Sequence, residues 1–169
     1  MFDDRSSRQV IKLSMIVFAT FGFIVPLLIG IIIYHEITFH ISLGTLFILL
    51  ICAAITSFLN AFIYSIFKKI PPNQKEGIIG GVIGAIAFFV LFTLYYFSLY
   101  DEALFKTFTN FIFRSYLLML IPLSASVVQG VIGGYYIGGR IRSIIGSFLM
   151  GFVVFFVMYF IFFTFGGGD

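Results

Sequence analysis

The chain has 169 residues, of which 61% are hydrophobic and 10% are charged, and its formal net charge at pH 7 is +3. A soluble domain carries about 25% charged and roughly 45 to 50% apolar residues, so this composition excludes an ordinary soluble domain. The mean hydropathy of +1.15 and the long apolar runs predict an all-α integral membrane protein. Lys and Arg are scattered at the ends of these runs, which argues against nucleic-acid binding. Cys52 is the only cysteine, which excludes an internal disulfide.

Five apolar runs predict a bundle of five transmembrane helices within one domain, 1–169. The expected spans are 13–34, 43–67, 77–100, 115–139 and 143–165. No signal-peptide cleavage site follows the first run, so we expect it to be retained, with a kink at Pro26. Between the third and fourth spans, apolar residues recur at helical spacing over 102–113, which predicts a short interfacial helix.

Polar side chains recur on the second and fourth spans. Because such groups are costly against lipid, we expect them to face other helices, with Asn60 and Gln129 at similar depth in the interior. A predicted ligand-binding pocket between these two spans is lined by Thr56, Asn60, Ser126 and Gln129.

Glycines are concentrated on the third and fourth spans. The predicted helix-packing residues are Gly77, Gly80, Gly81, Gly84, Gly130, Gly134 and Gly138. The first four form two overlapping GxxxG pairs, a pattern typical of closely packed membrane helices. We therefore expect spans three and four to pack closely at the centre of the bundle. The glycines lack the strand context of a nucleotide-binding loop, so no nucleotide cofactor is expected.

Basic residues are distributed unequally between the two ends of the predicted bundle. Eight Lys and Arg residues fall at one end and two, Lys106 and Arg114, at the other. The positive-inside rule then predicts a cytoplasmic N-terminus and an external C-terminus, and we expect the membrane to be the plasma membrane. Arg140 and Arg142 are candidates for contact with anionic lipid headgroups.

Two parts of the chain resemble each other. Gly77–Gly81 matches Ser143–Ser147 at an offset of 66, and Tyr64–Lys68 matches Tyr136–Arg140 at an offset of 72. This pattern suggests that spans two and three duplicate spans four and five as a second helix hairpin in the same orientation.

His35, Glu36 and His40 form the cluster in the sequence that most suggests a metal site. The second histidine follows the first by five positions, which on a helix places them on different faces. No ionisable residue lies in the middle of an apolar run, which argues against a proton or ion pump. We therefore expect no metal, no cofactor and no enzymatic activity.

These patterns favour a non-enzymatic function that depends on helix association. The expected partners are the lipid bilayer and other membrane helices, with the protein acting as a subunit of a membrane complex or as a homo-oligomer joined through GxxxG surfaces. The alternative is a small carrier or channel for a neutral or hydrophobic solute, which would bind between spans two and four. An interior cavity that is lined by Thr56, Asn60, Ser126 and Gln129 and open to one side would favour the carrier. A dry, glycine-packed interior with a second glycine face turned outward would favour association.

Overall fold

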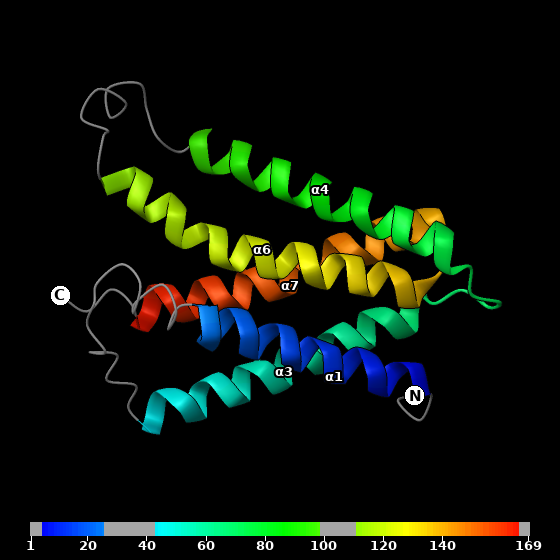
Figure 1. Ribbon diagram of the computed structural model, residues 1–169, viewed down its shortest axis with the longest axis horizontal. Coiled ribbons are helices and arrows are strands. Elements are labelled where there is room, and N and C mark those ends of the chain that lie inside the picture. The colour runs from blue at the N-terminus through cyan, green and yellow to red at the C-terminus, as the bar shows by residue number, and fades with distance from the viewer. Residues whose placement is uncertain (1–4, 26–42, 99–110, 166–169) are drawn as a thin grey trace.

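A computed structural model describes residues 5–25, 43–98 and 111–165, and in these ranges the chain is helical with no strand (Figure 1). The helices are α1 (Arg5–Ala19), the π-helical turn η1 (Thr20–Ile24), α3 (Leu43–Phe67), α4 (Gln74–Ser98), α6 (Phe111–Ile137) and α7 (Arg140–Phe165). Four of them, α3, α4, α6 and α7, are long and apolar enough to cross a membrane. The predicted all-α class is confirmed, and these four helices fit a multi-pass membrane protein.

Several predictions fall wholly or partly on residues outside the described ranges. The first span, 13–34, is described only as far as residue 25, so the fifth membrane crossing stays a prediction. The predicted kink at Pro26 and the cluster at His35, Glu36 and His40 also lie outside the described residues. Directly before Pro26 the chain forms η1, in which the Val25 N–H bonds to the carbonyl of Thr20.

Helix boundaries follow backbone hydrogen bonding more closely than they follow hydropathy. α3 has the predicted bounds, but α4, α6 and α7 each begin three or four residues earlier than expected. The Asn73 side chain caps α4 by accepting the Glu76 N–H at 3.3 Å. The turn between α6 and α7 is only two residues long because Gly138 and Gly139 adopt positive φ angles of 65° and 141°. Most of the interfacial helix predicted over 102–113 lies outside the described residues, and its last three residues belong to α6.

The helices pack as a three-helix group and an attached pair. α4, α6 and α7 all contact one another, while α1 packs on α3 and α6, and α3 also contacts α7. In Figure 1, α4 and α3 lie at opposite edges, with α6 and α7 between them. The predicted contact between spans three and four is present as the α4–α6 interface, but α4 lies at an edge of the bundle and not at its centre. α6 and α7 form a closely packed pair, whereas α3 and α4 do not in the described residues, so the two predicted hairpins are packed differently and the duplication stays a prediction.

One glycine face of α4 lies against α6. Gly81 is close to Gly134 and to the carbonyl of Gly130, so that an added Cβ on Gly81 would lie 3.1 Å from the Gly134 Cα and 3.2 Å from that carbonyl oxygen. An added Cβ on Gly77 would lie 3.0 Å from the Gly138 Cα and would collide with the Gly134 carbonyl. Main chain therefore meets main chain at this interface, and a hydrogen atom is the only side chain that fits.

The second glycine face of α4 lies against α7. A Cβ on Gly80 would collide with the Arg140 carbonyl, and one on Gly84 would lie 3.1 Å from the Ser147 Cβ. α7 is also joined to α6 here, since the Ser143 hydroxyl donates to the Gly134 carbonyl at 3.1 Å. The glycines on both faces of α4, and those opposite them on α6, thus contact helices of the same chain.

Farther from the two-residue turn, the interface between α4, α6 and α7 changes from glycine to aromatic side chains. Phe88 of α4, Leu123 of α6 and Phe155 of α7 form a buried cluster. The Phe92 and Phe155 ring centroids are 4.1 Å apart, and those of Phe88 and Phe155 are 5.6 Å apart. Large rings need more space than glycines, so the three helices are closest at the glycine end of the group.

Gly134→Ala should destabilise the bundle by about 1 to 3 kcal/mol, because overpacking forces the backbones apart. The added Cβ would lie 2.6 Å from the Gly77 carbonyl oxygen. Gly22→Ala is the matched control, since the nearest neighbours of its Cβ, in Phe18 and Met158, would be 3.6 Å away. Thermal unfolding in detergent should show a lower midpoint for Gly134→Ala alone. Equal midpoints for the two variants would contradict the glycine contact.

Candidate functional site

The described part of the bundle contains buried polar side chains but no buried Asp, Glu, Lys, Arg or His. The fully buried ones are Ser7, Ser14, Thr56, Ser57, Asn60, Ser126, Gln129, Ser143 and Ser147. The four residues of the predicted ligand pocket are among them. The interior orientation predicted for Asn60 and Gln129 is therefore confirmed, while ligand binding by these residues stays a prediction.

Three of these side chains meet where α1, α3 and α6 come together. The Ser14 hydroxyl oxygen accepts a hydrogen bond from Gln129 Nε2 at 2.9 Å and another from Asn60 Nδ2 at 3.3 Å. We call Ser14, Asn60 and Gln129 the polar layer. The sequence predicts a pocket between spans two and four alone, but α1 lies beside both helices and its serine joins the two amides.

Ser14 is the residue of this site that the sequence-based prediction missed. The buried positions of α1 are Ser7, Val10, Ser14, Val17 and Phe18. The steps of three, four and three residues from Ser7 to Val17 are the signal of a helix with one buried face, and they begin before residue 13, where the first span was expected to start. Applied from residue 7 onward, this periodicity would have placed Ser14 in the interior.

Three buried oxygen atoms, two in the polar layer and one on Thr56, accept no hydrogen bond from the described residues. Asn60 Oδ1, Gln129 Oε1 and Thr56 Oγ1 are buried, and none of them has a partner among the described residues. A buried polar atom that lacks a partner costs about 1 to 3 kcal/mol. Because both amides contact the same serine hydroxyl, their unpaired oxygens lie in one small region of the interior.

Other hydroxyls nearby are satisfied by their own helices. Ser126 Oγ donates to the Leu123 carbonyl at 2.7 Å, and Ser57 Oγ donates to the Ala53 carbonyl at 2.7 Å. Ser126 was predicted to line the pocket, yet its proton is already used within α6. Within the predicted pocket, the residues with a buried oxygen that makes no hydrogen bond among the described residues are therefore Thr56, Asn60 and Gln129; Ser7, Thr93 and Ser147 have such oxygens elsewhere in the bundle.

Apolar clusters close the polar layer on both sides. Toward the turn between α6 and α7 lies a cluster of Val10, Ile63, Tyr64, Ile137 and Met150. On the opposite side lies a cluster of Val17, Phe18, Ala125, Val154 and Met158. The polar layer is consequently an enclosed hydrogen-bonding site within an apolar interior, where electrostatic interactions are strong because the local dielectric is low.

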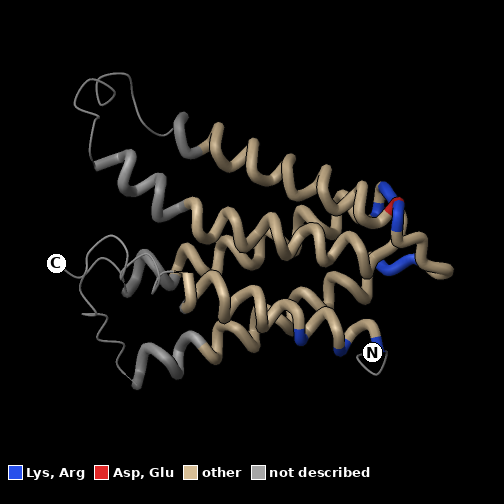
Figure 2. The backbone as a smooth tube through the Cα atoms, viewed as in Figure 1, with Lys and Arg blue, Asp and Glu red and all other residues tan. Residues whose placement is uncertain are grey.

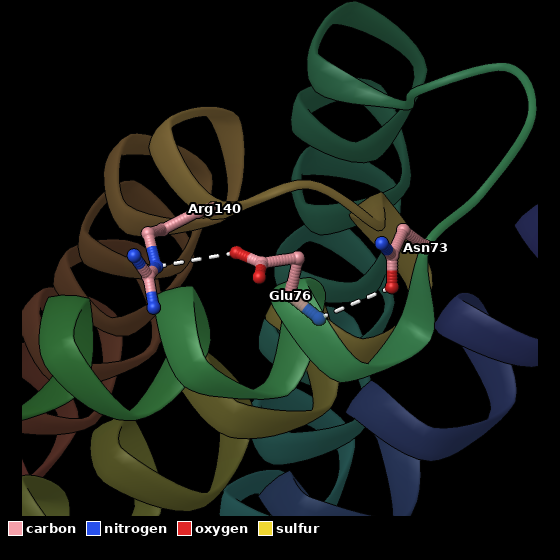
Figure 3. Close-up of polar contacts among 3 residues, drawn as sticks. All are labelled: Asn73, Glu76 and Arg140. Carbon is pink, nitrogen blue, oxygen red and sulfur yellow. Dashed lines mark hydrogen bonds and ion pairs between the residues drawn. The ribbon is translucent and has the colours of Figure 1, made fainter.

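The charged side chains that the structure describes lie at one end of the bundle. Figure 2 shows these Lys and Arg residues at the end that carries the N-terminus and the turn between α6 and α7, whereas Lys106 and the side chain of Arg114, expected at the other end, are not described. There Arg140 Nε pairs with Glu76 Oε2 at 3.2 Å and joins α7 to α4 (Figure 3). Arg142 Nη1 donates to the Lys68 carbonyl at 3.3 Å. Both arginines are exposed, so they remain available for the predicted contact with lipid headgroups.

Ser14→Ala should destabilise the bundle by about 1 to 3 kcal/mol, because it removes the acceptor of two buried N–H groups. Ser65→Ala is the control, since the Ser65 hydroxyl donates only within its own helix, to the Phe62 carbonyl, at an exposed site. Thermal unfolding in detergent measures both variants. A loss of stability for Ser65→Ala as large as that for Ser14→Ala would argue against the polar layer.

Similarity to known proteins assigns no function to this chain. No protein-family model matches it, and no match was found among curated proteins or among solved structures. The function proposed below is therefore derived from the packing, burial and charge of the chain's own residues.

Proposed function

We propose that the protein is a non-enzymatic membrane carrier or channel that holds a small neutral solute at the polar layer. The observation that supports this function is the group of unpaired acceptors, Asn60 Oδ1, Gln129 Oε1 and Thr56 Oγ1, buried in an apolar interior. Polar groups that only stabilise a helix bundle are usually paired with one another, and a group left unpaired calls for a partner. A solute that donates hydrogen bonds would satisfy them.

The chemistry of the polar layer suggests which solutes it accepts. Its unused groups are amide and hydroxyl oxygens, which favour hydroxyl or amide donors. No ionised side chain is buried among the described residues, so a charged solute would lack a counter-ion there. Small neutral molecules such as glycerol and urea carry suitable donors and are convenient probes.

Association with other membrane helices, the leading expectation from the sequence, has weaker support from the geometry. The glycines that would form the association surface contact α6 and α7 of the same chain. Large apolar side chains do cover the outer surfaces of α3, α4 and α7, but any membrane protein presents such residues to lipid. Association therefore stays a prediction and becomes the alternative if the solute experiment fails.

The orientation expected from the sequence also forms part of the proposal. We infer that the charged end faces the cytoplasm of a plasma membrane, because Lys and Arg are retained on that side. The support is the distribution in the sequence, in which eight Lys and Arg residues fall at this end and only Lys106 and Arg114 at the other; the described basic side chains lie at this end (Figure 2).

Lys75→Cys in a Cys52→Ala background tests the orientation in intact cells. Lys75 is exposed in the first turn of α4, and Cys52 is the only native cysteine, so one reactive thiol would remain. A membrane-impermeant maleimide should label it only after the cells are permeabilised. Labelling of intact cells to the same extent would place the charged end outside.

Proteoliposomes in a stopped-flow light-scattering assay test the transport function with glycerol and urea. Vesicles with the wild-type protein should take up at least one of the two solutes faster than empty vesicles. Gln129→Leu keeps a similar volume but removes the amide, and it should lower the protein-dependent rate roughly tenfold, the equivalent of one hydrogen bond.

Ser57→Ala is the matched control, because Ser57 is equally buried but bonds only to its own helix. This variant should keep the wild-type rate. Rates equal to those of empty vesicles for both solutes would overturn the proposal for this class of solute. An unchanged rate in Gln129→Leu would exclude the polar layer as the solute site.

A further inference from the structure

A cavity of about 490 Å³ opens at the charged end of the bundle, away from the polar layer. It is lined by Lys69, Glu76, Gly139, Arg140, Ile141 and Arg142. These residues come from the loop after α3, the start of α4 and the start of α7. The cavity thus lies where three separate segments converge, and its size is in the range of sites for small ligands.

The charge of this cavity favours an anion. Three cationic side chains and one carboxylate line it, which gives a net charge of +2. The carboxylate of Glu76 contacts Arg140 through Nε, and this contact leaves the two terminal nitrogens of the guanidinium without a partner in the described residues (Figure 3). A guanidinium held in this way presents a pair of N–H groups that matches the oxygens of a phosphate.

Exposed apolar side chains stand beside these cations. Ile141, between the two arginines, is 73% exposed, and Ile70, next to Lys69, is 82% exposed. In a membrane protein, isoleucines placed among cations at the end of the helices would lie at the boundary between headgroups and acyl chains. A ligand with both an anionic group and hydrocarbon chains fits this combination better than a free anion does.

We propose that this cavity binds the phosphate group of an anionic membrane lipid. The terminal nitrogens of Arg140, together with Arg142 and Lys69, contact the phosphate oxygens, and the acyl chains lie along Ile141. Glu76 acts as a positioning residue that holds Arg140 across the α4–α7 interface. This lipid site is separate from the polar layer, so it does not depend on solute transport.

Native mass spectrometry of the full chain in detergent tests the lipid site. Phosphatidylglycerol is the anionic probe, and phosphatidylcholine at equal concentration is the zwitterionic reference. The wild-type protein should retain phosphatidylglycerol in preference to phosphatidylcholine. A basic residue at a membrane surface contributes about fivefold to the affinity for anionic lipid, so Arg140→Gln with Arg142→Gln should weaken phosphatidylglycerol binding roughly 25-fold.

The control variant is Lys12→Gln with Lys75→Gln, which removes the same charge from the same end of the molecule. Both lysines are exposed and neither lines the cavity. This variant should keep the preference for phosphatidylglycerol. An equal loss of binding in the control would show that general surface charge, and not the cavity, attracts the lipid. Equal retention of phosphatidylglycerol and phosphatidylcholine by the wild-type protein would overturn the proposal outright.

A competition experiment separates a lipid from a soluble phosphate. Glycerol phosphate carries the anionic group without acyl chains, and at the concentration of the lipid it should displace little phosphatidylglycerol. Displacement of most of the bound lipid would mean that the acyl chains contribute nothing, and it would replace the lipid by a soluble phosphate ester as the ligand. Circular dichroism spectra confirm that each variant used in these comparisons is folded.

Discussion

Direct backbone contact at glycines is the constraint on which the rest of the bundle depends. Apolar side chains gain little by exchanging lipid for a helix interface, so membrane helices associate through close van der Waals packing and interhelical hydrogen bonds. α4 makes such contacts with two neighbours at once, because Gly77 and Gly81 face α6 while Gly80 and Gly84 face α7. Each added side chain there would meet main-chain atoms, which have no rotamer to move into.

The glycine contacts also position the polar layer. α6 contacts α4 through Gly134, and little more than one turn toward its N-terminus it carries Gln129 on a buried face. α1 and α3 then lie on the other side of the group and supply Ser14 and Asn60. Apolar clusters lie on both sides of these three residues, so their side chains meet at one level of the bundle between apolar surroundings. The glycines thus determine how closely the helices approach, and the polar layer places hydrogen-bonding groups in the apolar interior.

Much of the helical architecture could be predicted from the sequence, because a helix long enough to cross a membrane needs a run of mainly apolar residues. α3 has the predicted bounds, and Asn60 and Gln129 are buried as expected from the cost of exposing amides to hydrocarbon. Hydropathy says less about where a helix begins. α1 starts at Arg5 and α7 at Arg140, because helix ends depend on capping and on turn geometry, neither of which requires apolar residues.

The neighbours of each helix were the part that the sequence predicted least well. Similar residues in two hairpins suggested a duplication, but the glycines of α4 favour α6 and α7 over α3, so the first hairpin is not packed like the second. Likewise, two amides at similar depth suggested a direct pocket between α3 and α6, whereas a serine from α1 joins them. Which helices are neighbours depends on all interfaces together, and no single motif contains that information.

The central claim is that the unpaired oxygens of the polar layer hold a donor from outside the protein. A density map that resolves ordered solvent in the bundle interior, from protein purified in the presence of glycerol, tests this claim most directly. We predict non-protein density within hydrogen-bonding distance of both Asn60 Oδ1 and Gln129 Oε1. A dry layer, in which protein groups satisfy both amide oxygens, would contradict it and would make the layer a purely structural contact between helices.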